Sequence, residues 1–375
     1  MDISFKFNPE VLIGAETISM AGTIAGRYGS RIMIAADHKL DSQIVNRLKE
    51  ILKDSGLEAI VFDGIEDDSS AEMADNIVSL LSAAHCDAII GFGGAKTQTI
   101  SRMAAIMAPM NITSLELLDG RDCQGKFLPL LAIPTEGTDV FTASEFFLVA
   151  DPRSKLINSI SSPNHLYASI IIDSNLITIL SDNASSAFIF EGIFSAVEAY
   201  CSAKANFLSD TLLEKAISSF AKLLKKSSGS ASAETFAQAG MLLSIGSSVS
   251  SPGVGSALSA AINARCNIPK AQCSAALFPV IAERLVSARP EKMARVATML
   301  GAPKAATPTD AANSAVDAIR KSMTALGVPV DLKEHNVSLD RVTAAAEAAR
   351  KLDLTANSPW TVSEDEVFKI LKQIL

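Results

Sequence analysis

The sequence predicts an α/β domain with a parallel sheet over residues 1–180 and an all-α domain over residues 181–375. Short apolar strands alternate with amphipathic helices in the first half, a glycine-rich turn joins one strand to a helix, and only helical periodicity follows from about Asn175. Strands that alternate with helices form a parallel sheet covered on both faces. A chain of 375 residues is long enough for two domains, each with its own core.

Two units of strand and helix open the chain. Residues 30–37 form a short apolar run that closes on Asp37, and residues 57–63 repeat that design. Residues 41–54 and 71–84 carry apolar side chains at helical spacing on one face. Each strand is therefore expected to be followed by a helix that packs on the sheet.

A glycine-rich turn follows the next predicted strand, residues 87–90, and leads into an apolar helix through the sequence Gly91-Phe-Gly-Gly-Ala-Lys-Thr-Gln-Thr. Such a turn can cradle a phosphate, because glycines let the backbone approach it and free N–H groups at the helix start attract its charge. The same turn also occurs as a plain connection. Asp37 can accept hydrogen bonds from a ribose diol, or serve as a helix cap or turn residue. The first domain is therefore a candidate dinucleotide-binding domain.

The second half shows helical periodicity, rich in alanine and serine. Helices are expected over residues 184–203, 207–226, 233–249, 269–286 and 292–301. A substrate cleft is expected between the two domains.

Several segments, in order and at matching spacing, resemble the iron-containing alcohol dehydrogenase family, whose fold is related to that of dehydroquinate synthase. The segment LPLLAIPTEGTDVFT at residues 128–142 is similar to a family segment written roughly as PLIAIPTTAGTGSE, and Pro134, Thr135, Gly137 and Thr138 match after one deletion. Further matches are Lys155, Ser162-Pro163, the strand 170–173 and the closing segment 356–367. The resemblance covers the chain from about Phe7 to Leu375.

The resemblance implies an NAD site in the first domain. The positions that it assigns to the cofactor are Asp37, Gly93, Gly94, Ala95, Thr135, Thr138, Lys155 and Leu180. The sequence departs from the family where Gln98 and Ser101 replace an aspartate and a lysine, and where Asp139 enters the second phosphate loop. A carboxylate near a pyrophosphate repels it.

The resemblance also assigns a metal site to the second domain, with an acid and three histidines as ligands. The segment 191–200 aligns through Glu198-Ala-Tyr200, which places Glu191 at the acid and Ser195 at the first histidine. Ser256 and Lys270, fourteen residues apart, stand at the other two. Serine hydroxyls are poor ligands and an ammonium offers no lone pair, so no iron or zinc is expected.

Glu191 and Lys270 are the expected catalytic residues. Because both align with ligands of one ion, they are expected to lie within salt-bridge or single-water distance. In a functional interpretation, Lys270 replaces the charge of the metal and stabilises a developing alkoxide. In a structural interpretation, the two side chains only neutralise one another in a decayed site.

Three functions remain open on the sequence. The first is an NAD(P)-dependent oxidoreductase that acts without a metal on a small alcohol, aldehyde or ketone. The second is a non-catalytic relative that binds a nucleotide-like ligand or a protein partner. The third is a changed chemistry of the lyase type, which the related dehydroquinate synthases show to be possible on this architecture.

Composition excludes several partners and compartments. A net charge of −8 and a pI near 5.2 argue against a nucleic-acid surface. We expect a cytoplasmic protein, because no signal peptide and no apolar run of membrane-spanning length is evident. The five cysteines form no CxxC pair, and His38, His85, His165 and His335 are scattered.

A homodimer is expected by resemblance, with a small molecule as substrate. The extended segment from Asp2 to Val11 is a candidate for pairing with the sheet edge of a neighbouring chain.

Overall fold

The structure is a computed structural model that describes residues 7, 9–66, 70–122, 125–161, 167–177, 183–224 and 230–375. The chain divides into two compact units. The sheet unit comprises Met1–Asp139, Ala143–Ser154 and Asn158–Thr178, and the helical unit comprises Val140–Thr142, Lys155–Ile157 and Ile179–Leu375.

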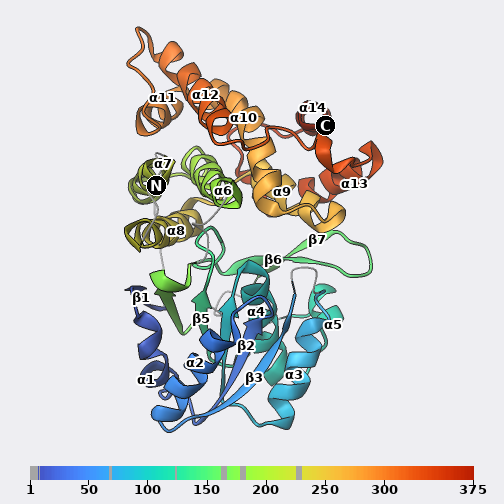
Figure 1. The fold of residues 1–375 in the computed structure, drawn as a ribbon. Helices are drawn as coiled ribbons and strands as arrows, with labels where there is room; N and C mark the ends of the chain where they lie inside the picture. Colours follow the sequence, from blue (N-terminus) through green and yellow to red (C-terminus); the bar gives the residue numbers. More distant parts are fainter. Residues whose placement is uncertain are drawn as a thin grey trace. The chain divides into compact units, whose positions relative to one another are not determined.

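The sheet unit is built on six parallel strands in the order β1-β8-β5-β4-β2-β3 (Figure 1). They are β1 (Glu10–Gly14), β2 (Arg31–Asp37), β3 (Glu58–Ile65), β4 (Ala88–Gly93), β5 (Leu130–Pro134) and β8 (Ser169–Asp173). Every residue of β4, β5 and β8 is buried. Apolar runs such as theirs are typical of the central strands of a parallel sheet, because both faces are covered.

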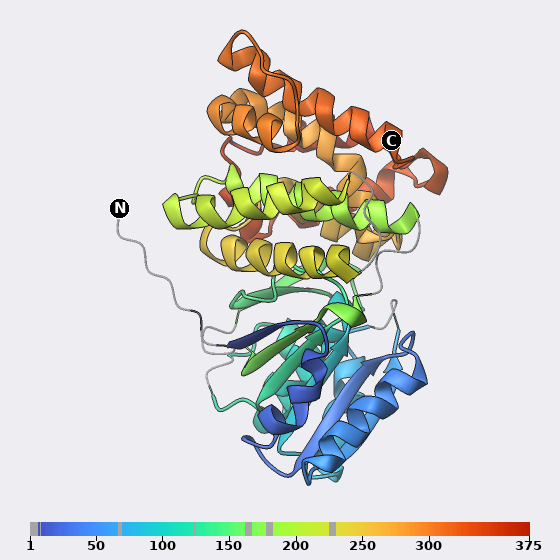
Figure 2. The same ribbon diagram turned by 60° about the vertical axis from the view of Figure 1, so that its left-hand side comes forward.

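Helices cover both faces of this sheet (Figures 1 and 2). They are α1 (Ala21–Ala25), α2 (Ser42–Asp54), α3 (Met73–Ala83), α4 (Ala95–Met110) and α5 (Ser114–Leu118), with the short 3₁₀ turns η1 (Thr17–Met20) and η2 (Ser174–Leu176). Alternate residues of β2, Ile32, Ile34 and Ala36, share one core with α1 and α2. The predicted helices at 41–54 and 71–84 are confirmed as α2 and α3.

The order in which the chain adds strands to the sheet changes direction at β2. The chain passes from β2 to β3 on one side and then to β4 on the other side of β2. In open α/β sheets, ligands bind outside the carboxyl ends of the strands at such a switch point. Asp37 ends β2 and Gly93 ends β4, so the topology brings these two predicted residues to that point.

Two features of the sheet unit differ from the prediction. The strand predicted at 87–90 continues to Gly93, because Gly91 and Gly93 pair with Ala132 and Pro134 of β5. Only Gly94 remains as the turn. In addition, β6 (Phe146–Ala150) and β7 (Ile157–Ser161) form a separate two-stranded sheet that the sequence analysis did not predict.

The N-terminal segment contributes to the sheet of its own chain. Glu10 and Val11 pair in parallel with Ser169 and Ile170. These two residues were expected to pair with the sheet edge of a neighbouring chain, but on this side they pair with β8 of their own chain. Residues 2–6 and 8 lie outside the described residues, and the homodimer stays a prediction.

The helical unit contains α6 (Asn183–Tyr200), α7 (Phe207–Leu223), α8 (Ser230–Ser250), α9 (Val254–Cys266), α10 (Lys270–Ala288), α11 (Pro290–Met299), α12 (Pro308–Ala325), α13 (Leu339–Arg350) and α14 (Glu364–Ile374), with 3₁₀ turns at Lys333–His335 and Asp353–Asn357. The five predicted helices are confirmed as α6, α7, α8, α10 and α11, although α6 ends at Tyr200 rather than at residue 203 and α11 ends at Met299 rather than at residue 301. Helices α9, α12, α13 and α14 were not predicted. Helix α9 shows no amphipathic pattern, because its serines are buried together with its apolar residues. All of its residues from Val254 to Ile262 are buried.

Helices α6, α9 and α10 pack against one another and form the centre of the unit. The rings of Phe194 on α6 and Phe278 on α10 lie 5.4 Å apart. A Cβ atom on Gly255 of α9 would lie 2.5 Å from Phe194, so only glycine permits this approach. Of the helices described, none is long and apolar enough to span a membrane.

Candidate functional site

Glu191 and Lys270 form an ion pair within the helical unit. Lys270 is the first residue of α10, and its Nζ lies 2.9 Å from Oε1 of Glu191 on α6. The side chains are 28% and 4% exposed. A lysine at the start of a helix meets the positive end of the helix dipole, so Glu191 compensates a charge that the helix itself disfavours. The predicted salt-bridge distance is confirmed.

A second carboxylate on α6, Glu198, caps the start of α9. It accepts hydrogen bonds from the N–H groups of Gly255 (2.6 Å) and Ser256 (2.8 Å) and from the Ser256 hydroxyl (2.7 Å). Burial raises the pKa of Glu198, and these hydrogen bonds oppose that shift because they favour the carboxylate. In the sequence, Glu198 fixes the alignment of α6, and this capping role was not predicted. The signal was its position seven residues after Glu191, on the same face of a largely apolar helix.

The side chains at the four aligned positions do not make a suitable donor set for iron or zinc. The Glu191 carboxylate is paired with an ammonium, and the Ser256 hydroxyl donates to Glu198. Ser195 is buried and contributes a neutral hydroxyl. Zinc and iron sites use carboxylates, imidazoles and thiolates. Within the described ranges, no three His, Cys, Asp or Glu side chains gather as a group able to hold a metal ion.

Hydrogen bonds between α9 and α10 fix the backbone at Lys270. The Ser259 hydroxyl lies 3.1 Å from the Lys270 carbonyl oxygen and 2.8 Å from the Ser274 hydroxyl. Ser259 and Ser274 are both buried. These contacts position the first turn of α10, and with it the ammonium that faces Glu191.

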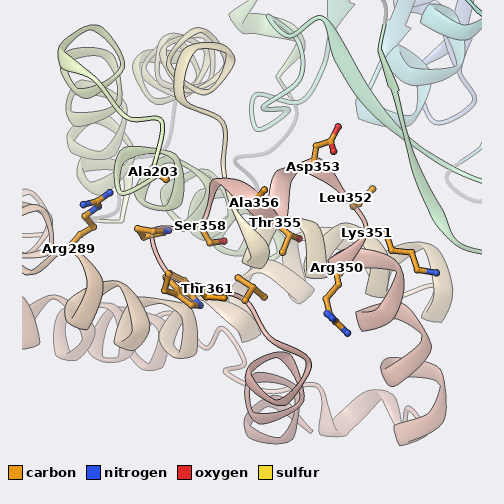
Figure 3. A pocket seen from close by; sticks show the side chains of 13 residues that line it. Ala203, Arg289, Arg350, Lys351, Leu352, Asp353, Thr355, Ala356, Ser358 and Thr361 are labelled. Carbon is orange, nitrogen blue, oxygen red and sulfur yellow. The ribbon is translucent and has the colours of Figure 1, made fainter. Parts of the chain in front are cut away.

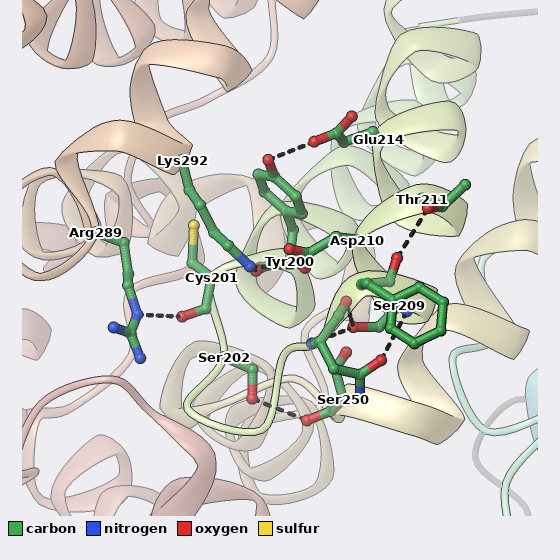
Figure 4. Close-up of polar contacts among 12 residues, drawn as sticks. Tyr200, Cys201, Ser202, Ser209, Asp210, Thr211, Glu214, Ser250, Arg289 and Lys292 are labelled. Carbon is green, nitrogen blue, oxygen red and sulfur yellow. Dashed lines mark hydrogen bonds and ion pairs between the residues drawn. The ribbon is translucent and has the colours of Figure 1, made fainter. Parts of the chain in front are cut away.

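The carboxyl end of α6 is held by a further set of polar contacts (Figure 4). The Tyr200 hydroxyl donates to Glu214 at 2.6 Å. Lys292 bonds both the Tyr200 carbonyl oxygen (2.6 Å) and Asp210 (2.7 Å), and its ammonium lies 4.4 Å from the centre of the Tyr200 ring. Ser202 donates to the carbonyl oxygen of Ser250 at 2.8 Å. This network fixes the helix that carries Glu191, Ser195 and Glu198.

A cavity of about 670 Å³ in the helical unit is lined in part by the closing segment of the chain (Figure 3). Its walls include Arg289, Arg350 and Lys351, but Figure 3 shows these side chains pointing in different directions. Arg350 donates to Glu364 at 3.1 Å. The cations do not converge on one point, so this cavity is a weaker candidate than the ion pair.

The strand, glycine turn and helix start that the sequence predicts as a phosphate cradle are present in the sheet unit, and a carboxylate of the chain lies in this cradle. Its role toward a phosphate stays a prediction. Gly94 joins β4 to α4, and the Ala95 N–H donates to Oε2 of Glu136 at 3.0 Å. A Cβ atom on Gly94 would lie 2.6 Å from Cδ of Glu136. Thr135 follows β5, and its N–H donates to the Gly93 carbonyl oxygen at 3.2 Å. Gly93, Gly94, Ala95 and Thr135 are therefore brought together as predicted.

Asp37 lies beside the cradle. A Cβ atom on Gly93 would lie 2.6 Å from Cβ of Asp37, so the ends of β2 and β4 are in contact. Asp37 accepts a hydrogen bond from the Lys39 N–H at 3.0 Å. It therefore acts as a turn residue, which is one of the two roles that the sequence allowed. Its side chain is 16% exposed. A role toward a ribose stays a prediction.

Asp139 lies near a buried cation, Arg102 of α4. The Arg102 guanidinium donates to the Ser144 carbonyl oxygen at 2.7 Å and lies 4.4 Å from the centre of the Phe147 ring. Burial lowers the pKa of Arg102, and the charge of Asp139 opposes that shift. Asp139 was expected to repel a pyrophosphate, but Glu136 is the carboxylate that bonds the helix start. Neither Glu136 nor Arg102 was predicted from the sequence.

The remaining predicted cofactor residues are Thr138, Lys155 and Leu180. Thr138 is buried in the loop after β5. Lys155 is exposed, adopts a left-handed conformation with φ of 58° and belongs to the helical unit. Leu180, Ser162-Pro163 and His165 lie outside the described residues.

Comparisons with known proteins cover nearly the whole chain. Residues 8–174 match the family model for iron-containing alcohol dehydrogenase, and residues 191–375 match that for the C-terminal part of the Fe-containing alcohol dehydrogenase family. The 1,3-propanediol dehydrogenase of Citrobacter freundii is 23% identical over 96% of this chain and 95% of its own. The choline dehydrogenase of Bacillus subtilis is 23% identical over 96% and 92%.

Two solved structures share the fold over the full chain. A structure of 1,3-propanediol oxidoreductase has a TM-score of 0.93 at 23% identity, with 100% of both chains covered. A sulfoacetaldehyde reductase from Bifidobacterium kashiwanohense in complex with NAD⁺ has a TM-score of 0.86 at 15% identity, with 100% of this chain and 99% of that chain covered. The predicted architecture, a parallel α/β domain followed by an all-helical domain, is confirmed.

Proposed function

Because the chain belongs to the iron-containing alcohol dehydrogenase family, we propose that it is a nicotinamide-dependent oxidoreductase that converts a small alcohol and its aldehyde or ketone without iron or zinc. Relatives named 1,3-propanediol dehydrogenase and lactaldehyde reductase support this substrate class. The observation that carries the proposal is the ion pair of Lys270 and Glu191, 2.9 Å apart, at positions that the family alignment assigns to metal ligands.

Lys270 is the proposed catalytic residue. In the direction of reduction, its ammonium would donate a hydrogen bond to the substrate carbonyl oxygen and stabilise the negative charge that develops there. Glu191 would hold the ammonium in place through the ion pair, and Ser259 would fix the backbone of the same turn. The oxygen would take up one proton in the overall reaction, as an alcohol forms.

NAD is the proposed cofactor, and when bound it would supply or accept the hydride. Asp37 would bind the ribose diol, while Gly93, Gly94, Ala95, Thr135 and Thr138 would surround the pyrophosphate. Glu136 packs on Gly94 and accepts from the Ala95 N–H, so a carboxylate of the chain occupies the phosphate side of this site. The ribose side of the site therefore fits a dinucleotide better than the phosphate side.

If the proposed site is correct, Asp37 should make NAD the preferred form over NADP, because a carboxylate opposite a 2′-phosphate is repulsive. The dissociation constant for NADP divided by that for NAD measures this preference. Replacing Asp37 with serine should reduce this ratio by about tenfold. The ratio would be measured by titration of both cofactors, followed by nicotinamide fluorescence. Asp63→Ser, an exposed acid near the end of β3, is the matched control and should leave the ratio unchanged. Equal affinities in the unmodified protein would show that Asp37 does not read the ribose.

A non-catalytic relative that binds a nucleotide-like ligand or a protein partner is the second candidate. The Glu136 carboxylate at the helix start favours it, because that carboxylate opposes a pyrophosphate. Oxidation of NADH in the presence of a panel of small aldehydes and ketones separates the two candidates. Turnover with any of them supports the oxidoreductase, while an absence of turnover with the whole panel supports the second candidate.

A further inference from the structure

The Glu136 side chain fills the part of the cradle that a pyrophosphate would enter. Its Oε2 lies 3.0 Å from the Ala95 nitrogen, at the start of α4. A Cβ atom on Gly94 would lie 2.6 Å from Cδ and from Oε1 of Glu136, so the carboxylate packs directly on the glycine backbone. A glycine without a Cβ atom lets a phosphate come close to the backbone, and here the Glu136 carboxylate takes that position instead.

The register of the sheet places Glu136 there. Gly93 at the end of β4 pairs with Pro134 at the end of β5, and the Thr135 N–H donates to the Gly93 carbonyl oxygen. Glu136 is two residues beyond Pro134, which brings it level with Ala95, two residues beyond Gly93. The contact therefore follows from the pairing of two central strands.

A buried hydroxyl beside the cradle indicates that a ligand acceptor belongs there. Thr97 on α4 is fully buried, and its Oγ1 has no hydrogen-bond partner among the described residues. If Gly93 carried a Cβ atom, that atom would lie 2.7 Å from Oγ1 of Thr97 and 2.6 Å from Cβ of Asp37. The Thr97 hydroxyl and Asp37 therefore both lie against the backbone of Gly93. A buried hydroxyl without a partner costs free energy, and a polar ligand at the ends of β2 and β4 would satisfy it.

We propose that Glu136 is an intramolecular competitor of nucleotide binding, whose carboxylate must leave the Ala95 N–H before a pyrophosphate can bind. Two anionic groups cannot share one helix start without strong repulsion. Glu136 therefore lowers the affinity of the cradle for ligands that carry a pyrophosphate and leaves its affinity for an uncharged nucleoside unchanged. This inference shares one assumption with the proposed function, namely that a dinucleotide is the ligand of this cradle.

The test is Glu136→Gln, which removes the charge but keeps an oxygen that can accept from the Ala95 N–H. Calorimetric titrations of the full chain with inorganic pyrophosphate, ADP-ribose and adenosine compare the variant with the unmodified protein. Pyrophosphate and ADP-ribose should bind on the order of tenfold tighter to the variant, because one unit of like charge has been removed at contact distance. Adenosine should bind equally to both.

Glu116→Gln is the matched control. Glu116 is also a carboxylate at a helix start in the sheet unit, where it accepts hydrogen bonds from Thr113 at the start of α5. Its loss of charge should change none of the three affinities. The Ala95 amide resonance, observed by NMR, should shift when pyrophosphate is added to Glu136→Gln, which localises the binding.

The outcomes separate this inference from the proposed function. If Glu136→Gln binds pyrophosphate and ADP-ribose no more tightly than the unmodified protein does, the competitor role is overturned, even if carbonyl reduction with NADH is observed. If the variant gains pyrophosphate affinity and still reduces no carbonyl compound, the competitor role stands and the oxidoreductase is refuted.

Discussion

Replacing Lys270 with methionine should lower kcat/KM for carbonyl reduction by about 10² to 10³-fold, which is the usual effect of removing one charge-stabilising donor from an active site. Methionine keeps much of the length of the side chain and removes the ammonium. Because the proposed hydrogen bond strengthens only as negative charge develops on the substrate oxygen, the loss should appear in kcat more than in KM. The measurement is steady-state oxidation of NADH with the best carbonyl substrate.

Two further variants make this result specific. Lys270→Arg keeps a positive charge and should recover part of the activity. Lys333→Met removes the lysine of an exposed ion pair with Asp331 in the same unit, and it should leave kcat/KM unchanged. If Lys270→Met reduces the substrate as fast as the unmodified protein, the structural interpretation of the ion pair is correct and Lys270 is not catalytic.

The second large effect concerns stability. Glu191→Gln alone should lower the free energy of unfolding by about 3 kcal/mol, because it removes the counter-charge 2.9 Å from the Lys270 ammonium, whose side chain is 28% exposed. Lys270→Met alone should cost a similar amount, since it removes the counter-charge 2.9 Å from the Glu191 carboxylate, whose side chain is 4% exposed. The double variant should cost less than either single variant, because no uncompensated charge remains.

Urea unfolding of the four proteins of this cycle measures the coupling between the two side chains. The pair Lys333 and Asp331, with side chains 69% and 30% exposed, serves as the control and should show almost no coupling. Additive losses at Glu191 and Lys270 would mean that the two charges act independently, against the distance seen in the structure.

The ion pair could be predicted because its two residues lie in segments with recognisable patterns. The run Glu198-Ala-Tyr200 fixed the register of α6, and the fourteen-residue spacing fixed Lys270 relative to Ser256. Both positions align with ligands of one metal ion in the family, so a correct alignment is enough to predict that Glu191 and Lys270 lie close together. The parallel sheet was predictable for a similar reason, since strand and helix patterns alternate along the chain.

Contacts that depend on the pairing of distant strands could not be predicted. Glu136 is visible in the sequence, but only the register of β4 against β5 brings it to the Ala95 N–H. Helix α9 was missed because burial on every side removes the periodic signal, and with it the cap that Glu198 makes was missed. The sheet of β6 and β7 was also missed, although Asp151-Pro152, which lies between the two strands, favours a turn.

The central claim is that a lysine does the electrostatic work of a metal, and it is tested most directly by measuring metal content and carbonyl reduction on the same preparation. The protein would be purified without chelator, analysed for iron and zinc, and then assayed with NADH before and after exhaustive chelation. We expect substantially less than one iron or zinc per chain, with activity that chelation does not reduce and added metal does not raise. One metal ion per chain, with activity lost on chelation and restored by iron or zinc, would contradict the claim.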